Sequence, residues 1–131
     1  MAKLTPEMKE MIGTQQCFVG TVSKDGIPNV APKRSTRVLD DETLIFSEGT
    51  GGATYRNLRN GSKVSVAVVN REKLDGYRFL GSAEVQNSGE HYEQAAAMAQ
   101  KNNMGKPLAV VLVRIEEIHS LKPRMAGKKI S

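Results

Sequence analysis

The stretch TLIFSEGTGGATYRNLRNGSKVSVAVVN, residues 43–70, places a glycine-rich turn between two apolar runs. The run TLIFSE (43–48) is typical of a strand. The alternating run KVSVAVVN (63–70) is a second strand candidate, because its valines at 64, 66 and 68 share one face. Between them, residues 54–60 predict a short helix that ends at Gly61. The stretch therefore predicts a strand, a turn, a short helix and a strand.

Further strands are expected on both sides of this stretch. They cover residues 17–23, an extended run at 27–39 that prolines interrupt, and residues 77–87 and 108–121. Asp25-Gly26 predicts a hairpin turn. Helices are expected at 5–12, where Thr5-Pro6 forms a helix start and Gly13 a stop, and at 90–103, where Ser88 can cap. Six strands with short connections and about three helices favour a mainly β, antiparallel barrel or sandwich.

Length and composition are those of one ordinary globular domain. The chain has 131 residues, of which 39% are hydrophobic and 25% charged, so we expect a single domain over residues 1–131. A single cysteine, Cys17, suits a reducing compartment and is expected to be buried. No apolar run reaches the length of a membrane helix, and the charged start does not resemble a signal peptide. These features predict a cytoplasmic protein without membrane contact.

The net charge of +5 invites a nucleic-acid interpretation, because lysine and arginine neutralise phosphates. The chain has only 5% aromatic residues and no tryptophan, so platforms for base stacking are scarce. We therefore expect no nucleic-acid binding. A basic groove for a small anionic ligand accounts for the same excess of charge.

The glycine-rich turn leaves two interpretations open. Residues 49–54 nearly match the G-x-G-x-x-G dinucleotide pattern, but the helix that follows is too short for a parallel crossover, and no P-loop lysine follows. In one interpretation the glycines only let the backbone turn and Thr54 caps the helix. In the other, the free amides at the helix start hold one phosphate, with Lys33, Arg34 and Arg37 supplying positive charge.

Residues 17–70 carry a resemblance to a known family. The string FVGTVSKDGIPNVAPKRSTRVLDDETLIFSEGTGGATYRNLRNGSKVSVAVV resembles the core of the pyridoxamine 5'-phosphate oxidase-like FMN-binding split-barrel family. Its features are a strand, a DG-x-P hairpin, a second strand, an acidic turn, a T-L-x-F strand, a small polar turn, RNL and a valine-rich strand. RFLGSAEV and the LKPRMAGKKI tail resemble the family more loosely. The resemblance implies a six-stranded, Greek-key, split β-barrel that works as a homodimer with FMN at the subunit interface.

The resemblance also implies which residues bind FMN. Thr54 should bind the phosphate through its hydroxyl and amide, helped by backbone amides around residues 51–53. The step at Ala53-Thr54, where the family often has a lysine or arginine, is uncharged, so neutralisation of the phosphate would depend on Lys33, Arg34, Arg37 or Arg56. Asn57 is either an exposed helix residue or a ligand contact. The expected cofactor-binding set is Lys33, Arg34, Ser35, Thr36 along the ring and ribityl chain, Ser47, Glu48, Gly49 and Thr50 facing the ring, and Gly52, Ala53, Thr54 and Asn57 near the phosphate.

No catalytic constellation stands out in the sequence. His91 and His119 are isolated and lack a second ligand at metal spacing, and Met98 and Met104 are expected to pack in the core. In a flavoprotein the flavin performs the redox step, so missing acid–base groups do not argue against one. The resemblance implies an FMN-dependent reductase or electron-transfer protein. The alternatives are a deazaflavin-dependent reductase and a non-catalytic protein that binds flavin or haem, for which His91 or His119 would be the axial ligand.

Overall fold

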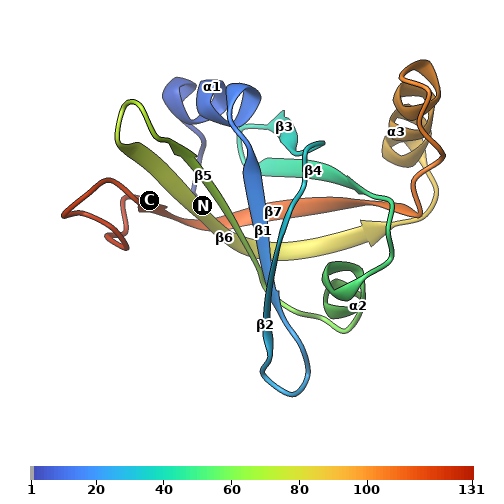
Figure 1. The fold of residues 1–131 in the computed structure, drawn as a ribbon, viewed down its shortest axis with the longest axis horizontal. Coiled ribbons are helices and arrows are strands. Elements are labelled where there is room, and N and C mark those ends of the chain that lie inside the picture. The colour runs from blue at the N-terminus through green and yellow to red at the C-terminus, as the bar shows by residue number, and fades with distance from the viewer. Residues whose placement is uncertain (1) are drawn as a thin grey trace.

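The computed structural model describes residues 2–131 and forms a seven-stranded antiparallel sheet with three helices (Figure 1). This confirms the mainly β fold with an antiparallel barrel-like sheet that the sequence predicts. The helices are α1 (Pro6–Thr14), α2 (Ala53–Arg59) and α3 (Glu90–Lys101). The strands are β1 (Cys17–Val22), β2 (Pro28–Pro32), β3 (Arg37–Asp40), β4 (Thr43–Glu48), β5 (Val64–Asn70), β6 (Asp75–Gln86) and β7 (Ala109–Ser120).

The sheet curls so that its two edges are joined by one short turn. The strand order is β2-β1-β5-β6-β7-β4-β3, so β2 and β3 lie at opposite edges. These two strands are nevertheless consecutive in the chain, and only residues 33–36 connect them. The sheet is therefore a barrel that is split between β2 and β3. We call this gap, spanned by residues 33–36, the seam.

The seam also explains why the structure has seven strands where six are expected. The run at 27–39, predicted as one extended segment, is interrupted by a turn after Pro32. Proline lacks the N–H that a strand ladder needs, so the break follows the second proline of the run. Residues 28–32 then pair with β1, and Arg37–Asp40 pair with β4 across the barrel.

The core fills the inside of the curled sheet. On β4, Leu44 and Phe46 point inward and are fully buried, whereas Ile45 points to the outer face and packs under α3. Helix α1 closes one end of the barrel with Met8, Met11 and Ile12. Strand alternation therefore assigns even-numbered residues of β4 to the inside and odd-numbered residues to the outside.

The helix ends differ from the expected ones in detail. Thr5 caps α1 and Pro6 is its first residue, as predicted, but the helix runs through Gly13 to Thr14. Helix α3 begins after Gly89, and neither Ser88 nor any other side chain caps it. Tyr92 and Ala95 attach α3 to the outer face of β4 and β7, and the Tyr92 hydroxyl donates to the Pro107 carbonyl at 2.8 Å. None of the helices in residues 2–131 is long and apolar enough to cross a membrane.

Candidate functional site

A groove of about 860 Å³ lies beside the seam. One wall is the turn at residues 33–36, another is the end of α1, the floor is the outer face of β4, and the far wall is α3 with the segment after it. Ligand pockets in proteins typically have volumes of this order. The residues of the expected cofactor site that line the groove are Lys33, Arg34, Ser35, Thr36, Ser47, Gly49 and Thr50.

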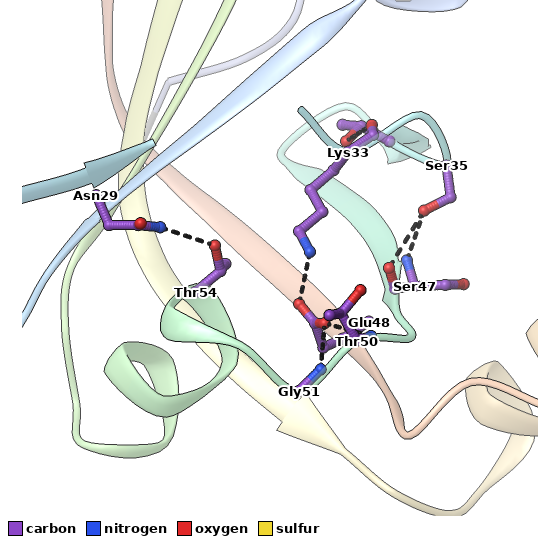
Figure 2. Close-up of polar contacts among 9 residues, drawn as sticks. Asn29, Lys33, Ser35, Ser47, Glu48, Thr50, Gly51 and Thr54 are labelled. Atoms are coloured by element: carbon purple, nitrogen blue, oxygen red, sulfur yellow. Dashed lines mark hydrogen bonds and ion pairs between the residues drawn. The ribbon is translucent and has the colours of Figure 1, made fainter. Parts of the chain in front are cut away.

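The turn at residues 33–36 is held in place by its own hydroxyl groups. The Thr36 hydroxyl donates to the Lys33 carbonyl at 2.7 Å. The Ser35 hydroxyl accepts from the Ser47 amide at 2.8 Å and so joins the turn to β4 (Figure 2). Ser47 faces outward because it alternates with the buried Phe46 and Glu48. The turn that spans the seam therefore has a defined conformation.

Lys33 and Glu48 form a buried ion pair next to the groove. The Lys33 ammonium nitrogen lies 2.7 Å from Glu48 Oε1, and the two side chains are 13% and 1% exposed. Glu48 points into the barrel because it lies on the same face of β4 as Leu44 and Phe46. Ser47 and Glu48 point to opposite faces, because they are neighbouring residues of a strand, and Glu48 is not among the groove-lining residues. That residues 47–50 face the ring stays a prediction, and the burial of Glu48 weighs against its own contact with the ring.

The Glu48 carboxylate also binds the glycine-rich turn. Its Oε2 accepts from the amides of Thr50 and Gly51, both at 3.0 Å. Burial raises the pKa of Glu48, but the bond from Lys33, the two amides and the charge of Lys33 outweigh it, so its pKa lies below the ordinary value. Glu48 is therefore an ionised carboxylate with three donors around it.

The positively charged side chains near the groove differ in whether they are already paired and in how exposed they are. Lys33 is neutralised by Glu48. The guanidinium of Arg37 donates to the Ser35 carbonyl at 3.2 Å, and burial lowers its pKa. Arg56 lies on the exposed face of α2 and is not among the groove-lining residues. Arg34 lines the groove and is exposed to solvent, which makes it the most accessible positive charge of this wall.

The start of α2 lies on the other side of the Lys33–Glu48 pair (Figure 2). Thr54 does not cap α2, because Gly52 is the N-cap and makes no side-chain bond. The Thr54 hydroxyl instead accepts from the Asn29 side chain of β2 at 3.1 Å, and Thr54 is buried. Asn57 is also buried rather than exposed, and its amide donates to the Thr21 hydroxyl of β1 at 3.0 Å. Gly52, Ala53, Thr54 and Asn57 thus form a second part of the expected site, outside the groove lining.

Helix α3 supplies a groove wall that the sequence does not predict. Ala95, Met98 and Ala99 line the groove, followed by Met104. Met98 and Met104 are 50% and 68% exposed, so the expectation that they pack in the core is wrong. Tyr92 and Ala95, in the N-terminal half of α3, pack against the sheet, whereas Met98 and, after the helix, Met104 line the groove. The helical spacing of residues 95, 98 and 99 is the sequence signal that could have indicated this wall.

The other candidate residues are not among the groove-lining residues. Cys17 is buried, as expected. His119 is also buried. Its Nδ1 accepts from Arg78 at 3.2 Å and its Nε2 lies 3.0 Å from a Glu117 oxygen. Neither His119 nor His91 is among the groove-lining residues. Within residues 2–131, no three His, Cys, Asp or Glu side chains are grouped so that they could hold a metal ion.

Comparison with known proteins places the chain in a family. The family described as pyridoxamine 5'-phosphate oxidase matches residues 4–122, so the chain belongs to this family, as the sequence resemblance predicts. The chain is 34% identical to the uncharacterized protein MJ0282 of Methanocaldococcus jannaschii, over 100% of this chain and 90% of that protein.

The fold is also found in solved structures of other proteins. The crystal structure of HupZ from Group A Streptococcus is 45% identical and has a TM-score of 0.86, covering 95% of this chain and 98% of that one. An FMN-binding protein from Syntrophomonas wolfei is 20% identical and has a TM-score of 0.73, covering 86% and 82% of the two chains. At this identity the second likeness concerns the fold alone.

Proposed function

We propose that the protein binds FMN in the groove beside the seam and acts as an FMN-dependent reductase or electron-transfer protein. The observation that carries the proposal is the groove itself, which sets hydroxyl groups and a free guanidinium opposite an apolar helix wall. FMN has a flat ring system and an anionic end, so it needs walls of both kinds. Membership of the pyridoxamine 5'-phosphate oxidase family supports the same ligand.

The residues present fit such a ligand. Ser35 and Ser47 offer polar atoms at the seam, and Met98 and Ala99 offer an apolar surface on α3. Arg34 supplies a positive charge for the phosphate. Gly52 and Ala53 are partly exposed residues at the start of α2, next to this polar surface. A direct phosphate bond from Thr54 stays a prediction of the family resemblance, and the burial of Thr54 weighs against contact through its hydroxyl.

When bound, FMN would supply the electron transfer, and the chain would position it. The hydroxyls of the seam would orient the polar edge of the ring. The apolar wall formed by Met98 and Ala99 of α3 would exclude water from one side, and Arg34 would hold the anionic end.

We further propose that two copies pair through the outer face of β1, β2 and β5. Phe18 pairs with Pro32 and Ala67 across these strands, and Gly20 pairs with Val30, so their side chains share one face. Phe18 is 41% exposed, Val30 68% and Val69 48%. A contiguous apolar surface of this kind is typical of an interface between proteins. Because β2 ends at the seam, pairing there would bring a second chain close to the groove, as a cytoplasmic homodimer with shared flavin sites requires.

The first test is the visible spectrum of freshly purified protein, with mass spectrometry of any chromophore released by heat. FMN in the released fraction, or tight binding of added FMN, would support the proposal. A colourless protein that takes up no FMN in a titration would contradict it.

The same spectrum separates the alternatives. A deazaflavin remains a candidate because the turn at residues 51–53 carries no charged side chain. Haem would give a Soret band that His119→Ala abolishes if His119 is the axial ligand. Both His119 nitrogens already have partners, so that role would break two existing contacts.

A further inference from the structure

Three donors converge on one point between the groove and α2. They are the Lys33 ammonium and the amides of Thr50 and Gly51, all within 3.0 Å of Glu48 oxygens. An ammonium group beside two adjacent backbone amides is an arrangement with which proteins bind oxyanions. In this chain the oxyanion is the protein's own Glu48 carboxylate.

The anion site is already formed around Glu48. Gly51 has a φ of +74°, and a Cβ there would lie 2.9 Å from Leu108 Cδ1, so the turn is adapted to glycine. The Glu48 carbonyl accepts from the Leu108 amide at 2.8 Å, which fixes the end of β4. Glu48 is 1% exposed. The Lys33 ammonium and the Thr50 and Gly51 amides therefore already donate to Glu48 when a ligand enters the groove.

We propose that Glu48 is a specificity-determining residue that occupies this anion site and keeps the anionic group of the ligand away from Lys33 and the Thr50 and Gly51 amides. The anionic group must then bind elsewhere, and Arg34 is the exposed cation of the groove. The contacts of Glu48 are sufficient to show that its carboxylate occupies the site. Its consequence for a flavin phosphate rests on the proposed function.

Removing the carboxylate should turn the site into one for a small external anion. Glu48→Ala deletes a group the size of acetate and leaves three donors around the hole. We expect this variant to lose thermal stability and to regain part of it in sodium acetate, compared with sodium chloride at equal ionic strength. Anything that binds the folded state alone raises the melting temperature in this way. The wild type should show no difference between acetate and chloride.

Two matched controls identify the site. Glu48→Gln fills the same space with a neutral group, so acetate should not stabilise it. In Glu48→Ala combined with Lys33→Met the ammonium is gone, so the effect of acetate should largely disappear. A Glu48→Ala protein that gains nothing from acetate would overturn the proposal. A Glu48→Ala protein that stays unfolded in acetate, although Glu48→Gln is folded, would also overturn the proposal.

The effect on ligand choice is measured as the FMN affinity divided by the riboflavin affinity, because these ligands differ only in the phosphate. In Glu48→Ala without acetate, the opened site should raise this ratio about tenfold, the equivalent of one hydrogen bond to a charged group. Acetate should return the ratio to the wild-type value. An unchanged ratio in a variant that acetate stabilises would overturn the specificity role. Failure of the wild type to bind FMN would instead contradict the proposed function and would leave the acetate result to decide whether the anion site exists.

Discussion

Lys33 lies in the turn that spans the seam, and its 2.7 Å contact with Glu48 joins this turn to the end of β4. The pair therefore ties the turn that follows the edge strand β2 to β4, at the border of the groove. A buried ion pair contributes little net stability relative to two apolar groups, but breaking it leaves one charge unpaired. Its effect on the fold thus depends on whether one partner or both are replaced.

We predict that Lys33→Met lowers the free energy of unfolding by about 3–5 kcal/mol, because the buried Glu48 carboxylate loses its counter-ion. Urea denaturation at pH 7 measures this change. Combining Lys33→Met with Glu48→Gln removes both charges and should recover much of the loss. If the single and double variants are equally destabilised, the cost comes from packing and not from the unpaired charge.

The same pair should make stability depend on pH on the acidic side. The pKa of Glu48 is lowered in the folded protein from its ordinary value of 4.5, so the unfolded chain binds the proton more readily. The contribution of Glu48 is fully present above the ordinary value and is lost as the pH falls through the lowered folded value. Urea midpoints measured from pH 7 down to pH 3 should fall more steeply in the wild type than in the variant with both charges removed. Parallel curves would show that Glu48 does not contribute.

The sequence predicts the elements of this fold better than the contacts of its site. The alternation of residues 64–68 and the turn at Asp25-Gly26 are local features, and the structure forms a strand and a hairpin there. The pairing of Lys33 with Glu48 depends on how the sheet closes, which no local pattern encodes. Strand alternation could have indicated that Ser47 and Glu48 point apart. The contacts Thr54–Asn29 and Asn57–Thr21 join α2 to strands far away in the chain, so only the tertiary structure shows them.

Arg34→Ala should weaken FMN binding about tenfold and leave riboflavin binding nearly unchanged, because it removes a bond to the charged phosphate. Fluorescence titration with both ligands measures the two dissociation constants. Arg56→Ala is the matched control, since Arg56 is exposed on α2 and is not a groove-lining residue. An equal loss of affinity in both variants would point to general charge attraction and not to a contact with Arg34.

Val30→Lys should weaken self-association. Val30 lies on the exposed apolar face of β2, and a lysine there would place two like charges near each other if two copies pair through this face. Sedimentation analysis across a range of protein concentrations gives the oligomeric state. Leu74→Lys, an equally apolar and exposed position in the turn between β5 and β6, is the control. A Val30→Lys protein as dimeric as the control would exclude this face as the interface.

Cys17 should be unreactive in the folded protein. Burial raises the pKa of its thiol to about 11, so almost none is in the reactive thiolate form at pH 8. A thiol-specific reagent should label the native protein slowly and the urea-unfolded protein rapidly. Fast labelling under native conditions would mean that β1 opens to solvent, since Cys17 is its first residue.

The seam has a mechanical consequence for the whole barrel. The turn at residues 33–36 connects the two sheet edges, and the Ser35–Ser47 bond and the Lys33–Glu48 ion pair join this turn to β4. As edge strands, β2 and β3 each pair with a single neighbouring strand. A ligand that contacts both edges of this gap would stabilise the closed barrel, because it binds only while the edges are together. Removal of the ligand should then raise the rate of amide hydrogen exchange first in β2 and β3, before it rises in the strands at the centre of the sheet.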